Sequence, residues 1–137
     1  MYMTTTVLER TEEYTIERAD ALGVPIFTYN EYLTGERLRE VARRWEAIIE
    51  ATGVERYVVN TEAFMAHEEE DKQWLGETWL PNLIDHGVRA GAGVYADSAI
   101  SSLDMGRIES TLNAIDPDFE YRTFGSEADA LEWIAEQ

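Results

Sequence analysis

The chain contains no cysteine and a single lysine, Lys72, among its 137 residues. The lack of cysteine excludes disulfides, thiolate metal ligands and thiol nucleophiles. Histidine is almost as scarce, and His67 and His86 are too far apart in sequence to form a metal-binding pair one helical turn apart. We therefore predict no cofactor and no metal site.

Long apolar runs are absent as well, and no stretch approaches the length that a membrane-spanning helix needs. The opening sequence, MYMTTTVLERTEEY, lacks the apolar segment that is typical of a signal peptide. We therefore expect a cytoplasmic protein without a membrane span.

Acidic residues dominate the charge: 28 Asp and Glu stand against 11 Lys and Arg, which gives a net charge of -17. Nucleic acid is a poor partner for such a surface, because binding phosphate requires a basic patch. Many acids with almost no lysine are typical of cytosolic proteins from salt-accumulating organisms. At low salt these carboxylates repel each other and oppose compaction, whereas concentrated cations screen them. We predict a halophile-like protein whose folding depends on salt.

The apolar pattern predicts alternating strands and helices within one domain, residues 1–137. Strands are expected at residues 14–18, 26–32, 57–61, 88–95 and 119–124. Helices are expected at residues 34–52, at 68–86, within 97–115 and after Ser126, which precedes Asp129 in a capping box. The first two strands form a hairpin, and helices separate the later ones, which implies parallel pairing. The predicted class is α/β, with a mixed, mostly parallel sheet of about five strands, an N-terminal hairpin and about four helices.

Two local features carry specific structural predictions. Pro81 lies inside the expected helix 68–86, where it cannot donate a hydrogen bond and disfavours helical geometry at Leu80. We predict a break in the helical bonding near Leu80 without an end to the helix. Gly91 and Gly93 make the strand 88–95 unusually small-sided. They lack the third glycine of a dinucleotide loop, so we attribute them to close packing of a helix on this strand.

One group of residues carries a family resemblance, namely Trp74, Leu75, Trp79, Leu80, Pro81 and Gly87, with the ending FGSEADALEWI at residues 124–134. With the order of elements, they resemble the STAS-like proteins. These are relatives of the sulfate-transporter and anti-sigma-factor-antagonist domain and include the SpoIIAA-like and STAS/SEC14 groups. The resemblance covers the chain from about Tyr14 onward. It implies a STAS-like fold and a regulatory role that depends on binding another protein.

Phosphorylation-switched members of this family carry a serine or threonine after the central strand, where added phosphate changes partner contacts. The matching stretch here, residues 64–71, contains no hydroxyl. Thr61 is the nearby candidate, but a threonine at a strand end more often satisfies a turn with its own hydroxyl. The resemblance therefore implies an interaction module without the phosphorylatable serine. The acidic run at residues 68–71 then serves either as a permanent docking surface or as a match to its own helix dipole.

Function is expected at the end of strand 57–61, because the carboxyl ends of parallel strands present binding loops. The candidate partner or ligand surface comprises Asn60, Thr61, Phe64, Met65, His67 and Trp74. Phe64 and Met65 either plug the core or contact the partner. The expected partner is an unknown protein, or a second copy in a homodimer.

A small-molecule or lipid carrier is the alternative function, with an apolar cavity beneath helix 68–86. The four tryptophans of the chain would line that cavity, although such large side chains more often fill the interface between helix and sheet. An enzyme is disfavoured, because no nucleophile, base and orienting group can be assembled from the sequence.

Overall fold

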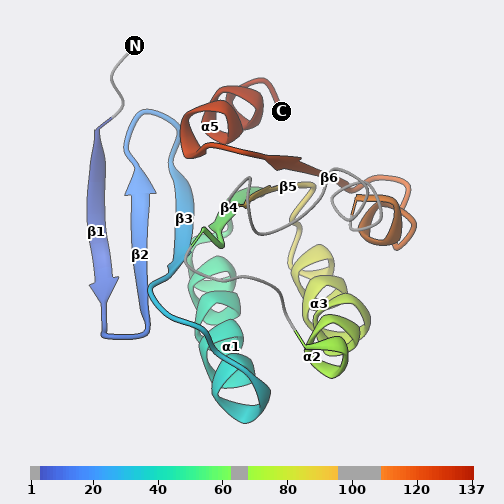
Figure 1. Ribbon diagram of the computed structural model, residues 1–137. Coiled ribbons are helices and arrows are strands. Elements are labelled where there is room, and N and C mark those ends of the chain that lie inside the picture. Colours follow the sequence, from blue (N-terminus) through green and yellow to red (C-terminus); the bar gives the residue numbers. More distant parts are fainter. Residues whose placement is uncertain (1–3, 63–67, 96–108) are drawn as a thin grey trace.

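The computed structural model of the chain describes residues 4–62, 68–95 and 109–137. One sheet lies between helices on its two faces (Figure 1). The elements are β1 (Thr5–Arg10), β2 (Tyr14–Ala19), β3 (Val24–Tyr29), α1 (Gly35–Thr52), β4 (Arg56–Asn60), α2 (Glu69–Trp74), a π-helical turn (Leu75–Trp79), α3 (Leu80–Asp85), β5 (Ala90–Val94), β6 (Glu120–Phe124) and α5 (Glu127–Ala135). Residues 109–113 are also helical, and the remainder of the predicted helix before them, residues 97–108, lies outside the described residues.

The sheet is mixed and follows chain order, β1-β2-β3-β4-β5-β6. Strands β1, β2 and β3 pair antiparallel, whereas the pairs β3–β4, β4–β5 and β5–β6 are parallel. This arrangement confirms the predicted α/β class with its N-terminal hairpin. Helices connect the later strands, as parallel pairing requires.

The sheet has six strands where about five were predicted, because β1 was not anticipated. Val7 and Leu8 are adjacent in β1 and remain 47% and 43% exposed. The alternation of apolar and polar residues that identifies a half-buried strand is therefore missing. A register shift between Val7 and Glu9 interrupts the pairing of β1 with β2 and disturbs that alternation further.

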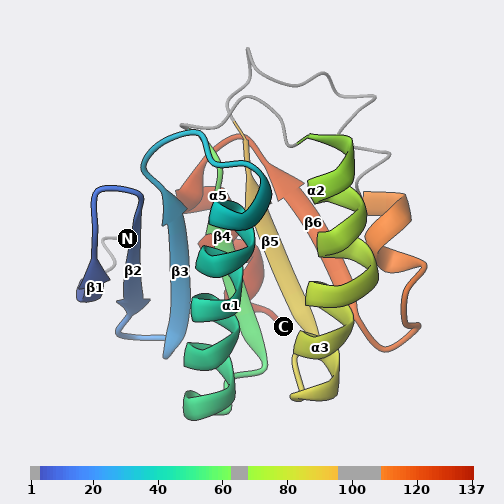
Figure 2. The same ribbon diagram turned by 90° about the horizontal axis from the view of Figure 1, so that it is seen from below.

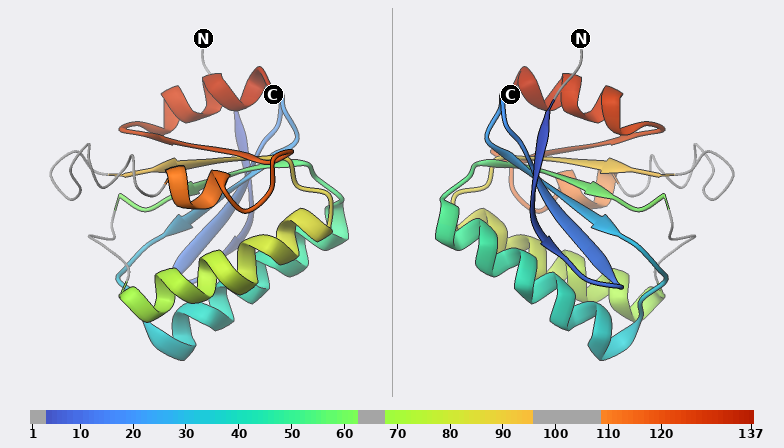
Figure 3. Two further views of the ribbon diagram at one scale, coloured as in Figure 1. Left: turned by 90° about the vertical axis from the view of Figure 1, so that its right-hand side faces the viewer. Right: turned by 90° about the vertical axis from the view of Figure 1, so that its left-hand side faces the viewer.

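The two faces of the sheet are covered by different helices. Figure 2 shows α1, α2 and α3 in front of the sheet and α5 behind it, and Figure 3 shows the same layers from the side. Successive residues of β4 enter opposite cores: Tyr57 and Val59 belong to the cluster under α1 and α3, and Val58 to the cluster under α5. Trp45 of α1 stacks on Phe27 at 4.9 Å between ring centroids.

Two helix ends follow from single residues that the sequence identifies. Gly53 ends α1 in a left-handed conformation with φ of 68°, and its N–H donates to the Ile49 carbonyl. Ser126 begins α5, where its hydroxyl accepts from the Asp129 amide at 3.2 Å. Both confirm their predicted roles.

The break predicted near Leu80 is present as a π-helical turn between α2 and α3. The Leu80 amide donates to the Leu75 carbonyl, five residues back, instead of four. Pro81 then lies in the first turn of α3, where a missing N–H costs little. The helix continues through Leu83 and Ile84, which are buried, as predicted.

The glycines of β5 accommodate tyrosines from neighbouring strands, a contact that the sequence did not predict. Gly91 pairs with Tyr57 of β4 on one side and Tyr121 of β6 on the other. A Cβ at Gly91 would lie 2.7 Å from the Tyr57 ring, and one at Gly93 would overlap the Tyr121 hydroxyl. Among the described residues, aromatic rings therefore occupy the space next to these glycines.

Candidate functional site

Thr61 directly follows β4 and is closed off from solvent. Its side chain is 3% exposed, and its hydroxyl donates to the Val94 carbonyl of β5 at 2.7 Å. The Thr61 amide donates to the same carbonyl at 2.8 Å. The hydroxyl thus extends the pairing of β4 with β5 by one residue, which is the local backbone role expected for a threonine at a strand end.

Asn60, the last residue of β4, joins this strand to the start of α5. Its side-chain amide donates to Glu62 Oε1 at 3.2 Å and to Glu127 Oε1 at 3.3 Å. Its side-chain oxygen accepts from the Glu62 amide at 2.9 Å. Asn60 therefore bridges two carboxylates and orients the residue after Thr61.

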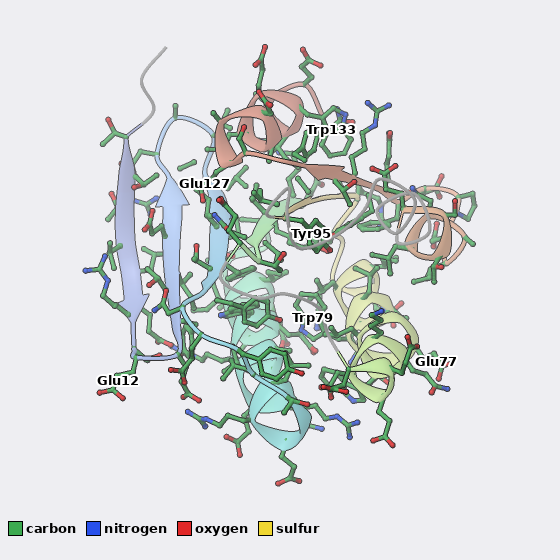
Figure 4. All side chains as sticks on the ribbon, in the orientation of Figure 1. Glu12, Glu77, Trp79, Tyr95, Glu127 and Trp133 are labelled. Atoms are coloured by element: carbon green, nitrogen blue, oxygen red, sulfur yellow. The ribbon has the colours of Figure 1, made fainter. Side chains whose placement is uncertain are left out.

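Glu127, in the first turn of α5 (Figure 4), is a site residue that the sequence did not reveal. Partial burial raises the pKa of its carboxyl, the Asn60 hydrogen bond opposes this, and the carboxylates of Glu17 and Glu62 raise the pKa further. An acid in a first helical turn normally indicates only a match to the helix dipole. Glu127 reaches Asn60 of β4 only when α5 packs on the folded sheet, so the local sequence does not reveal this contact.

Trp74, at the end of α2, packs against α1. The guanidinium carbons of Arg39 and Arg43 lie 5.5 and 5.6 Å from the centroid of its ring. Trp74 is half-buried, in contrast to Trp45 and Trp79. Of the predicted surface, Trp74 contacts α1 whereas Asn60 contacts α5, so the structure places these two on different layers. Phe64, Met65 and His67 lie outside the described residues.

Asp71, in the acidic run at the start of α2, has a structural role that the sequence did not indicate. It is 2% exposed, and its carboxylate accepts from the Thr34 hydroxyl at 2.8 Å and the Gly35 amide at 3.1 Å. These groups lie where α1 begins, so Asp71 stabilises another helix rather than only its own. Glu68, Glu69 and Glu70 remain exposed beside it.

The buried tryptophans fill the interfaces between helices and sheet. Trp79 lies between α1 and its own helix (Figure 4), and its indole N–H donates to the Ala42 carbonyl at 2.6 Å. Its ring meets Tyr57 edge-on at 6.1 Å. Trp133 packs on Phe124 at 5.8 Å under α5. These contacts bear out the packing role that we weighed against a cavity lining.

A pocket of about 450 Å³ lies at the opposite edge of the sheet, at the amino ends of β4, β5 and β6. The two arginines that line it are held by backbone carbonyls. Arg56 donates to Ile134 O at 2.9 Å and to Leu22 O at 3.2 Å, and Arg89 to Val88 O at 2.9 Å. The pocket is therefore separate from the candidate surface around Thr61 and Trp74, and its arginines have structural partners.

The described residues contain neither a cluster of metal ligands nor a helix that could span a membrane. Within residues 4–62, 68–95 and 109–137, no three histidine, aspartate or glutamate side chains come together as metal ligands. None of the helices in the described part of the chain has the length and apolar character needed to cross a bilayer.

Comparison with solved structures identifies the fold. The chain is similar to an uncharacterized protein of the DUF3478 family from Shewanella loihica PV-4, which is described as having a SpoIIAA-like fold. The TM-score is 0.54 and the identity 16%, over 96% of this chain and 93% of that one. The fold is SpoIIAA-like. It is therefore STAS-like, as the sequence predicted.

A second solved structure with this STAS-like fold is an anti-sigma factor antagonist from Mycobacterium paratuberculosis. Here the TM-score is 0.50 and the identity 13%, over 97% of this chain and 94% of that one. No protein-family model and no curated protein sequence matches the chain. The likeness thus concerns the fold, and the chemistry of this chain has to be argued from its own residues.

Proposed function

We propose that this STAS-like domain is a non-enzymatic interaction module that binds a protein partner through α2 and the carboxyl end of β4. An anti-sigma factor antagonist, named for its action on another protein factor, has the same fold. Fold alone does not determine function, so the proposal depends on the surface itself. Two features of that surface support it.

The observation that carries the proposal is the burial of Thr61. A kinase needs access to a hydroxyl, whereas this one is 3% exposed and donates to the Val94 carbonyl at 2.7 Å. Phosphorylation there would break the hydrogen bond and bury a dianion. Glu68, Glu69 and Glu70, exposed at the start of α2, instead provide fixed negative charge close to this strand end in sequence. We therefore infer docking without a phosphorylation switch at Thr61.

The second feature is the outward side of α2. Gln73 and Glu77 are exposed, and Trp74 remains half-buried beside them. A partly exposed tryptophan surrounded by polar residues is typical of an interaction surface, because aromatic residues are enriched at the centres of such surfaces. Beneath α3, Leu83 and Trp79 are buried in the same cluster as Tyr57. This packing favours a docking surface over the carrier alternative, which requires an apolar cavity below the helix.

Affinity capture from a lysate of the source organism at high potassium chloride tests this function. The wild-type chain and Thr61→Val, which removes the hydroxyl at nearly constant volume, should retain the same protein in equal amounts. Native mass spectrometry of the eluate should show a complex of two proteins.

Two results would contradict the proposal. A bound small molecule without any protein partner would favour the carrier. Phosphate on Thr61 of the wild-type protein, together with altered capture by Thr61→Val, would show that the switch has been kept.

A further inference from the structure

Arg39 and Arg43 form no ion pair with any residue that the structure describes, although acids outnumber bases by 28 to 11 in the sequence. Four other arginines of the described chain form ion pairs, namely Arg18 with Asp20, Arg37 with Glu13, Arg44 with Glu9 and Arg122 with Glu120, and Arg56 and Arg89 donate to backbone carbonyls. By contrast, no carboxylate among the described residues lies within 4 Å of Arg39 or Arg43. The Nε of Arg39 is buried without a hydrogen-bond partner. Among the described residues, the two guanidinium groups thus lack the direct carboxylate contact that the four ion-paired arginines of the chain make.

Both guanidinium groups approach the indole ring of Trp74, at 5.5 and 5.6 Å from its centroid. When the face of a guanidinium contacts an aromatic ring, the N–H groups at the edge of the guanidinium remain available for hydrogen bonds. A carboxylate that reaches such an edge forms a charge-assisted, often bidentate pair. Trp74 therefore pre-orders Arg39 and Arg43 for an anion.

Their spacing indicates which anion fits. Arg39 and Arg43 are one helical turn apart on α1, and like charges at this spacing repel each other. Two carboxylates one turn apart on another helix have the same separation, about 5–6 Å between Cβ atoms. Such a pair would neutralise both arginines at once.

We infer that Arg39, Trp74 and Arg43 form a receptor for an acidic helical segment of the protein partner, with one carboxylate on each guanidinium. The inference rests on the proposed function and specifies the chemistry of its partner. A short segment fits better than a long polyanion, because the net charge of -17 repels extended negative charge. At physiological salt that repulsion is screened beyond about 8 Å, so a short segment experiences less of it than an extended polyanion does.

The test uses two alanine-rich helical peptides, one with two glutamates a turn apart and one with glutamines at the same positions. Each is titrated into the isotopically labelled full chain. The glutamate peptide should shift the NMR signals of the Trp74 indole N–H and of the Arg39 and Arg43 Nε–H groups. The glutamine peptide should leave these signals in place.

A double variant, Arg39→Gln with Arg43→Gln, should weaken binding of the glutamate peptide by about tenfold or more, because two charge-assisted contacts are lost. The control, Arg18→Gln with Arg122→Gln, changes net charge equally at ion-paired arginines outside this receptor and should bind as the wild type does. Retained binding in the first variant, or equal losses in both, would overturn the inference. So would equal shifts with the glutamine peptide or with inorganic phosphate at matched ionic strength, or no shift at all.

Capture experiments separate this inference from the function on which it rests. If the wild type and Arg39→Gln/Arg43→Gln retain the same protein equally well, the receptor is contradicted and the docking function stands. If the wild type retains no protein, the docking function itself is contradicted.

Discussion

The carboxylate of Asp71 in α2 accepts hydrogen bonds from Thr34 and Gly35 at the start of α1, 36 to 37 residues earlier in the chain. Thr34 occupies the N-cap position of α1, but its own side chain makes no capping bond to that helix. Asp71 supplies both the acceptor and the negative charge that a helix start favours. This contact ties α2 to α1 and so helps to place Trp74 beside Arg39.

Replacing Asp71 with alanine should lower the free energy of unfolding by about 1–3 kcal/mol. The Thr34 hydroxyl and the Gly35 amide would lose their acceptor in a partly buried setting. Urea unfolding measures the loss. Glu70→Ala, at the exposed neighbouring position, is the control and should change stability by less than about 0.5 kcal/mol. Similar losses in both variants would mean that the helix contact contributes nothing specific.

A methyl group at Gly93 should destabilise the protein by about 1–3 kcal/mol, because it would overlap the Tyr121 hydroxyl. In a Tyr121→Phe background the same change should cost less, since the overlapping oxygen is gone. A double-mutant cycle in urea measures this coupling. Gly76→Ala is the control: its Cβ would lie 4.0 Å from Leu112, and it should stabilise the helix by up to about 1 kcal/mol. If the losses in unfolding free energy from the changes at residues 93 and 121 were strictly additive, the overlap would be refuted.

Glu127 predicts a specific pH dependence. Because its pKa is raised in the folded state, the native protein holds this proton over a pH range where the unfolded chain has lost it. The stability contributed by Glu127 therefore falls as pH rises from the ordinary glutamate pKa through the raised one. Relative to Glu127→Gln, the wild type should lose stability as pH rises above the ordinary glutamate pKa of about 4.3, until the raised pKa has been passed. Urea unfolding of both proteins across this range measures the difference, and a difference that is constant or grows with pH would refute the assignment.

The excess of acidic residues predicts that salt stabilises the fold. The melting temperature should rise between dilute buffer and roughly 1 M potassium chloride, because screening weakens repulsion among carboxylates. Glu132→Gln with Glu136→Gln, two exposed positions near the C-terminus, removes part of that repulsion and should reduce the rise. Calorimetry is the measurement, and a melting temperature independent of salt would show that self-repulsion is unimportant.

Most of the fold was predictable because its signals are local. The apolar spacing of α1, Gly53 after it and Ser126 before α5 each determine structure over a few residues. Pro81 likewise revealed a break in the helix, although not that the break would be a π-helical turn. Strand β1 was not predicted, because Val7 and Leu8 are adjacent and exposed and so do not alternate with polar residues.

The candidate site was less predictable because its contacts join distant residues. Thr61 was identified from its place at a strand end, but its bond to Val94 spans 33 residues. Asp71 looked like one acid in a run, and only the packing of α2 on α1 distinguishes it from exposed Glu70. The sequence does not distinguish Arg39 and Arg43 from the other arginines of α1, and only the packing of α2 on α1 brings Trp74 to them.

The location of the docking surface can be measured directly, because the chain has no cysteine and any introduced one is unique. Gln73→Cys places a thiol on the exposed side of α2, and Glu132→Cys places one on the exposed side of α5. Each is coupled to a polyethylene glycol maleimide, and retention of the captured partner is compared with that of the uncoupled variant. Our account predicts that the polymer at residue 73 blocks partner binding and that the polymer at residue 132 leaves it intact. Full binding with the polymer at residue 73, or a block at residue 132 alone, would contradict a docking surface on α2.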